Sequence, residues 1–177
     1  MDLVIAKLIM RLAKKRNCNM AVLTEKQIKY GFDYYHKDDA RPKSVVEVSE
    51  YDGEDKLIIN CTQLDEGYSA KAKKRIWMEW CDFLVNNPDA FTELMFCTRM
   101  PQDLFDAVCA QRRLKKLHIK WGVYPDIPKL ENLQELKYLH IGSGRSVSSL
   151  EPISKLENLV APVSYTHLRA HETKANL

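Results

Sequence analysis

Several sequence patterns that carry chemistry are missing from this chain of 177 residues. It contains no G-x-G-x-x-G motif, no phosphate-binding loop, no C-x-x-C pair and no H-E-x-x-H motif. These absences argue against the common nucleotide-binding, redox and zinc-peptidase sites. The sequence therefore predicts no enzyme activity, no cofactor and no bound metal.

An excess of charge of one sign is also missing. Lys and Arg number 27 and Asp and Glu number 24, and the net charge of +3 is too small to indicate a nucleic-acid partner. A basic strip of Lys71, Lys73, Lys74 and Arg75 leaves nucleic-acid binding open as an alternative. These residues fall on the outer side of a predicted amphipathic helix, where a solvated face is the ordinary interpretation, so we expect no nucleic acid.

Long hydrophobic runs are absent as well. The apolar stretch of residues 3–10 is interrupted by Lys7 and is too short to span a bilayer. An acidic residue before it and basic residues after it give the wrong charge order for a signal peptide. We expect an amphipathic helix here that caps the rest of the fold or lies against it, with a membrane-surface helix as the alternative. A second helix is predicted from Thr24 to Tyr35, since Thr24 and Gln27 have capping-box spacing.

Cysteine is present but in no paired pattern. The five cysteines are an odd number, and Cys81 and Cys109 lie on the apolar faces of predicted helices. Buried free thiols in a reducing compartment are the better interpretation, and a secreted disulfide framework is the alternative. The sequence therefore predicts a cytoplasmic protein.

What the chain does contain is a repeat. The segment Leu114-Lys-Lys-Leu117-His-Ile119 returns 22 residues later as Leu136-Lys-Tyr-Leu139-His-Ile141, and Phe91-Thr-Glu-Leu94-Met-Phe96 has the same pattern. Apolar residues two apart point to one face of a strand, and copies at a fixed period indicate stacked units. We predict neighbouring parallel strands near residues 57–60, 94–97, 117–120 and 139–142. Leu94, Leu117 and Leu139 should form one buried column.

The connections between these strands have helical periodicity. Ser69 is placed to cap a helix that ends at Asn86-Asn87-Pro88, and Pro101 is placed to open another. The predicted apolar faces are Ile76, Trp77, Trp80, Cys81, Leu84 and Val85 in the first helix, and Leu104, Phe105, Val108 and Cys109 in the second. Each helix should cover the outer side of the strands. A further short strand is predicted at residues 45–48.

The later units are shorter and carry a second motif. Ile127-Pro-Lys-Leu130-Glu-Asn-Leu133 returns as Ile153-Ser-Lys-Leu156-Glu-Asn-Leu159. With the strand motif, this pattern resembles the leucine-rich repeat family, and the later units resemble its short, internalin-like bacterial subclass. Gly122 and Gly144, which we expect at sharp turns, stand where that family usually carries asparagine. The resemblance implies an α/β leucine-rich repeat solenoid with parallel strands on the concave side, helices on the outer side and an N-terminal α-helical cap.

Three regions follow from these patterns. Residues 1–56 form the helical cap region, residues 57–161 form the repeat region, and residues 162–177 fit no repeat position. This last run resembles the translation of an adaptor used in sequencing libraries, so we interpret it as a non-native tail; a genuine polar tail is the alternative. On this interpretation the chain is a truncated fragment whose natural form continues with more repeats, its last unit is frayed, and His167 and His171 have no role.

The candidate site is the concave face of the sheet. Residues between the buried leucines should form columns, with Glu93, Lys116 and Tyr138 in one, and Met95, His118 and His140 in the next. Further columns hold Cys97, Lys120 and Gly142, then Thr98, Trp121 and Ser143. The predicted partner-binding residues are Lys116, His118, Lys120, Trp121, Tyr138 and His140.

Two of these candidates have alternatives. His118 and His140 would make a metal clamp or a pH-sensitive contact, but a solvated side-chain ladder is the favoured interpretation, since a metal needs further ligands. Trp121 would contact a partner or fold under the loop at residues 123–125. Cys97 lies too far along its strand to form a nucleophilic pair with a histidine.

The function predicted from these features is a protein–protein interaction scaffold that holds an unidentified protein partner without catalysis. One alternative is the recognition part of a larger enzyme or effector whose catalytic domain lies beyond this chain. The other is the nucleic-acid-binding protein already mentioned.

Overall fold

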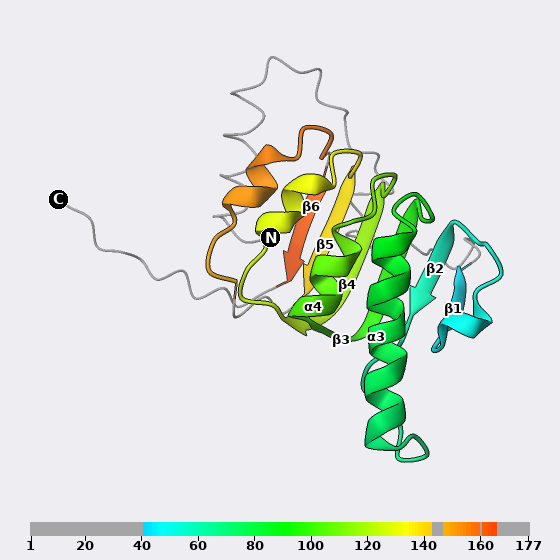
Figure 1. Cartoon of the computed structure of the whole chain (residues 1–177). Coiled ribbons are helices and arrows are strands. Elements are labelled where there is room, and N and C mark those ends of the chain that lie inside the picture. The colour runs from blue at the N-terminus through cyan, green and yellow to red at the C-terminus, as the bar shows by residue number, and fades with distance from the viewer. Residues whose placement is uncertain (1–40, 143–146, 160, 166–177) are drawn as a thin grey trace.

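A computed structural model describes residues 41–142, 147–159 and 161–165 of the chain. The chain forms an α/β structure in which six parallel strands lie side by side in chain order (Figure 1). The strands are β1 (Lys43–Val45), β2 (Lys56–Ile59), β3 (Glu93–Pro101), β4 (Lys116–Val123), β5 (Tyr138–Gly142) and β6 (Ala161–Tyr165). The helices are α3 (Ala70–Asn86) and α4 (Gln102–Val108), with short 3-10 helices η1 (Val48–Glu50), η2 (Pro128–Asn132) and η3 (Glu151–Lys155).

The leucine column predicted from the repeat is confirmed. Leu57 pairs with Leu94, Leu94 with Leu117, and Leu117 with Leu139, strand by strand. None of these four side chains is more than 2% exposed, and all belong to one core with Ile59, Phe96, Ile119 and Ile141. The predicted parallel neighbours and their order are therefore right.

A second repeating feature is a backbone ladder just before each strand. The amide of Thr92 donates to the carbonyl of Asp55 at 2.8 Å, that of Lys115 to Thr92 at 2.8 Å, and that of Lys137 to Lys115 at 2.9 Å. Each of these residues immediately precedes a strand. The polar backbone at the turn is thereby paired between successive units, as buried or strained turns require.

Both predicted helices are present and cover one face of the sheet (Figure 1). Ser69 caps α3 by accepting from the amide of Ala72 at 3.2 Å, and α3 ends at Asn86 with Asn87 as its C-cap. Ile76, Trp80 and Leu84 are buried as predicted, but Val85 is 55% exposed because α3 turns it away from the core. All four predicted apolar residues of α4 are buried.

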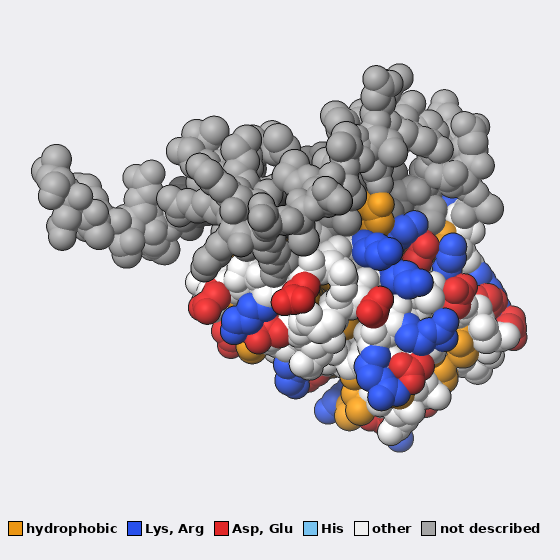
Figure 2. All heavy atoms as spheres, turned by 90° about the horizontal axis from the view of Figure 1, so that it is seen from above, with side chains coloured by type: hydrophobic (Ala, Val, Ile, Leu, Met, Phe, Trp, Pro, Cys, Tyr) orange, Lys and Arg blue, Asp and Glu red, His pale blue; other side chains and the backbone are white. Residues whose placement is uncertain are grey.

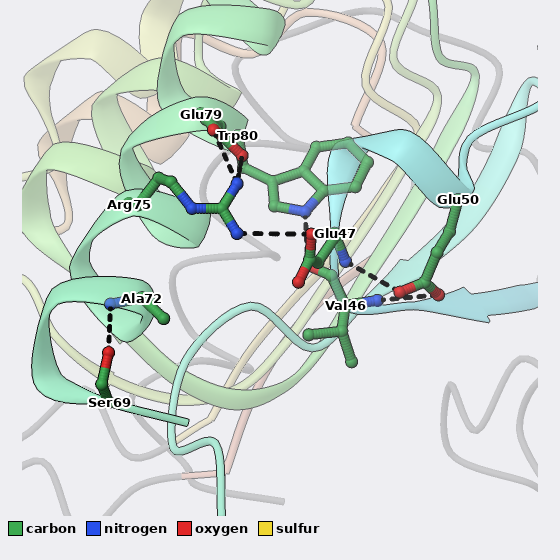
Figure 3. Close-up of polar contacts among 8 residues, drawn as sticks. All are labelled: Val46, Glu47, Glu50, Ser69, Ala72, Arg75, Glu79 and Trp80. Atoms are coloured by element: carbon green, nitrogen blue, oxygen red, sulfur yellow. Dashed lines mark hydrogen bonds and ion pairs between the residues drawn. The ribbon is translucent and has the colours of Figure 1, made fainter. Parts of the chain in front are cut away.

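The predicted strand at residues 45–48 is displaced. β1 ends at Val45, and the chain turns into η1 at Val48. This edge is fastened to α3, because the indole Nε1 of Trp80 donates to the carbonyl of Val46 at 2.8 Å (Figure 3). Arg75 pairs with Glu79 at 2.9 Å and reaches Glu47 at 3.5 Å. A part-buried hydrogen bond from the buried Trp80 and an exposed ion pair thus hold the first strand to α3.

The prediction for the last unit is wrong in its register. Between β4 and β5, the amide of Leu133 donates to the carbonyl of Leu130 and that of Leu136 to Leu133. Between β5 and β6, the amide of Leu156 donates in the same way to Ile153 and that of Leu159 to Leu156. Leu156 therefore takes the place of Leu133, although the shared L-E-N-L letters align it with Leu130. This shift of three residues puts β6 beside β5, with Tyr138 opposite Ala161, so the final unit is not frayed.

Two glycines lie inside strands, and one of them, Gly122, was expected at a turn. Gly122 lies inside β4, where an added Cβ would come within 2.6 Å of the carbonyl oxygen of Met100 and 2.2 Å of the Tyr124 ring. Gly142, in β5, has even less room, since a Cβ would meet the carbonyl oxygen of Lys120 at 1.8 Å. These strands need glycine for close approach rather than for a turn.

Some predictions fall outside the described residues. They concern the N-terminal helices, Gly144, His167, His171 and all but the strand backbone of the tail at 162–177. Within the described part of the chain, no helix combines the length and apolar character needed to cross a lipid bilayer.

Candidate interaction face

The candidate site lies on the sheet face turned away from α3 and α4, here called the distal face. Successive side chains of a strand point to opposite sides, so the residues between the buried leucines project there. The distal face comprises Lys56, Ile58, Glu93, Met95, Lys116, His118, Tyr138 and His140, in the register predicted from the repeat.

Its first row is a charged network at the start of the strands. The carboxylate of Glu93 forms ion pairs with the ammonium groups of Lys56 at 3.3 Å and Lys116 at 3.0 Å. The Lys116 ammonium also lies 5.9 Å from the ring centre of Tyr138, within cation–π range. Glu93 is only 9% exposed, so this pairing is less screened by solvent than a surface ion pair.

The second row is apolar and aromatic. Ile58, Met95, His118 and His140 lie side by side on successive strands. The two imidazole rings stack 4.1 Å apart and are inclined by only 3°. Burial, and secondarily the neighbouring His140, lowers the pKa of His118 to about 4. The row therefore presents a neutral histidine at physiological pH.

The predicted solvated histidine ladder is wrong, since His118 and His140 are each 9% exposed. The geometry does not favour the metal-clamp alternative either. Ring-nitrogen lone pairs lie in the ring planes, and parallel stacked planes do not direct them to one point. Among the residues with described positions, no group of three or more His, Cys, Asp or Glu side chains is arranged to hold a metal ion.

A bulge in β3 changes the third row. Phe96 pairs with Ile119 but Arg99 pairs with Trp121, so two residues of β3 face the single Lys120. The predicted column of Thr98 with Trp121 is therefore wrong. Arg99 takes that place, with its guanidinium 5.9 Å from the centre of the Trp121 ring.

The segment after β2 holds the bulge in place. The hydroxyl of Thr62 donates to the carbonyl of Arg99 at 2.5 Å and is hydrogen-bonded to the hydroxyl of Thr98 at 2.8 Å. The amide of Arg99 donates to the side chain of Gln63 at 2.8 Å. Bulges commonly redirect a side chain next to a binding site, and this one directs Arg99 to the tryptophan.

The four described cysteines, Cys61, Cys81, Cys97 and Cys109, are free thiols. Burial raises the pKa of Cys61 to about 12 and that of Cys81 to about 11. It also raises the pKa of Cys97, although Lys120 and Arg41 act in the opposite direction. Thiols with raised pKa values are poor nucleophiles at neutral pH.

The structure thus brings four of the six predicted residues together. Lys116, His118, Tyr138 and His140 form one contiguous block, and Lys120 and Trp121 lie further along β4. Arg99 is the contributor that the sequence did not reveal, because its position depends on the bulge. At the end where the strands begin, Figure 2 shows basic and acidic side chains interspersed, with apolar ones only in small patches.

Comparisons of the chain with family models, with curated proteins and with solved structures found no match. The likeness to leucine-rich repeats therefore depends on the residues of this chain and on the repeating contacts described above.

Proposed function

We propose that this chain is a protein-interaction scaffold of the leucine-rich repeat type that holds a protein partner by contact and not by catalysis. The observation that supports it is the register of β3, β4 and β5, which aligns side chains of successive units in rows. Stacked units of this kind build extended surfaces for partners. A cytoplasmic setting fits the free thiols.

The accessible part of the site is the rim at the far ends of β3 and β4. Arg99 and Lys120 are exposed there and Trp121 is half-buried, whereas His118 and His140 form the buried floor. Tryptophan and arginine are the residues most enriched at binding hot spots. The only carboxylate of the three rows, Glu93, is already paired with two lysines. The rim thus favours an acidic partner that offers an apolar group to Trp121.

Substitutions in the rim test this proposal. The partner is captured by crosslinking with the full chain as bait, and its affinity for purified variants is then measured. We expect Trp121→Ala to weaken binding at least tenfold, which corresponds to about 1.4 kcal/mol. Lys120→Glu should weaken it and reduce its salt dependence, because a cation facing an acidic partner is lost.

Lys74→Glu is the matched control for Lys120→Glu, since Lys74 is an exposed lysine of the α3 basic strip. It should leave the affinity unchanged. Binding that survives both rim substitutions, or that only Lys74→Glu abolishes, would overturn the proposed site.

A further inference from the structure

Part of the distal face is buried although the helices pack on the other side, and Met95 in its second row is half-buried. Ile58 is 6% exposed, and His118 and His140 are 9% exposed. The core formed with α3, α4, η2 and η3 contains the leucine column but neither Ile58 nor the histidines. The distal residues are therefore removed from solvent by something other than the described helices.

The path of the chain just before β1 indicates what covers them. Arg41 acts electrostatically on the thiol of Cys97, so the two lie near each other. Cys97 belongs to β3, two strands away from β1, and follows Phe96 on the distal side. The side chain of Arg41, which adjoins residues 1–40, is therefore within electrostatic reach of the distal side of β3.

We propose that residues 1–40 dock in cis on the distal face, over Ile58, Met95, His118 and His140. Parallel sheets are usually covered on both faces, because their strands are apolar on both sides. A helix of about 12 residues is about 18 Å long, which matches the width of four strands at about 4.8 Å spacing. The apolar run at residues 3–10 supplies the side chains for such a contact.

If residues 1–40 dock in this way, the second row and the rim of the distal face have different occupants. The N-terminal segment takes the buried floor, and Arg99, Lys120 and Trp121 remain for a partner. That consequence rests on the proposed function, but the docking itself does not. A second copy of the chain is the competing occupant, and the experiment below separates the two.

The first test is photo-crosslinking in the intact chain. p-Benzoyl-phenylalanine replaces Met95 on the distal face or, as the control, Met78, which is 48% exposed on α3. We expect crosslinks from position 95 to peptides of residues 1–40 within one monomer, and none to them from position 78. Crosslinks between two copies, or none to residues 1–40, would overturn the docking.

The second test is cleavage after folding. A protease site is inserted between Ala40 and Arg41, the chain is cut, and native mass spectrometry measures whether the fragment stays bound. We expect a 1:1 complex, at least tenfold weakened by Met95→Lys and unaffected by Met78→Lys. Release of the fragment from an unsubstituted, still folded remainder would overturn the proposal. Neither test involves a partner, so both leave the proposed function to its own experiment.

Discussion

At the scale of single residues, Gln111 has a role that its place in a short loop conceals. Its side chain is fully buried, and its amide donates to the carbonyls of Leu84 at 2.6 Å and Asn87 at 2.9 Å. Its carbonyl oxygen accepts from the amide of Phe91 at 3.3 Å. Gln111 thus satisfies backbone groups that the end of α3 leaves without helical partners.

Gln111→Leu should be strongly destabilising. Leucine keeps most of the volume but leaves the Leu84 carbonyl and the Phe91 amide unpaired, whereas the Asn87 carbonyl still accepts from the Ala90 amide. Each buried unpaired group costs about 1–3 kcal/mol. We expect the free energy of unfolding in urea to fall by about 3 kcal/mol. Gln134→Leu is the control, since Gln134 is exposed, and it should change stability by less than about 0.5 kcal/mol. Equal effects would contradict the role given to Gln111.

At the scale of elements, the sequence predicted the helices and the paired strands better than their irregularities. The apolar periodicity of α3 and α4 and the L-x-x-L-x-I spacing follow directly from which side chains face the core. The bulge at Cys97 and Thr98 does not follow, because Thr62 and Gln63 hold it from a distant segment. The predicted pairing of β3 with β4 is therefore right up to Phe96, and the Arg99–Trp121 contact beyond the bulge was not predicted.

The attachment of the first strand to α3 is testable at the same scale. Trp80→Phe keeps an aromatic ring in the core but removes the donor to the carbonyl of Val46. We expect a loss of about 1–2 kcal/mol, because the part-buried Val46 carbonyl loses its donor and the smaller ring fills less of the core. Hydrogen exchange should accelerate most at the Asn60 amide, which donates to Val45 at 2.9 Å.

Arg75→Ala is the comparison for this variant. Arg75 joins the same elements through ion pairs, but its side chain is 51% exposed. Exposed pairs contribute little, so the loss should stay below about 1 kcal/mol. A larger effect for Arg75→Ala than for Trp80→Phe would mean that charge, and not the hydrogen bond from Trp80, holds the edge strand.

At the scale of the whole molecule, the repeat predicted the order of the strands but not what surrounds them. Each unit specifies its neighbours through the leucine column, so the parallel order and the Lys116–Tyr138 and His118–His140 pairs could be predicted. The repeat period of the sequence carries no information on the surroundings of the distal face, and His118 and His140 were wrongly expected to be solvated. The pairing of β6 with β5 was also missed, because the two L-E-N-L motifs are 26 residues apart whereas the paired residues Tyr138 and Ala161 are 23 residues apart.

The buried histidine row makes the stability of the whole fold dependent on pH. His118 has a folded-state pKa of about 4, below the ordinary value of 6.5, so the unfolded chain binds a proton more readily. The stabilising effect of keeping His118 neutral is complete above pH 6.5 and is lost as pH falls toward 4. Between pH 7 and 5, where most carboxylates stay ionised, this loss amounts to about 2 kcal/mol.

Urea unfolding at pH 7, 6 and 5 should therefore show a falling free energy of unfolding. His118→Gln should be less stable at pH 7, since the stack on His140 is lost, but its stability should change little between pH 7 and 5. The change in slope is the decisive measurement, because loss of packing alone lowers stability equally at every pH. A variant that retained the slope of the unsubstituted chain would place the titrating group elsewhere. A lost slope would identify His118 as the group whose protonation lowers the stability of the fold.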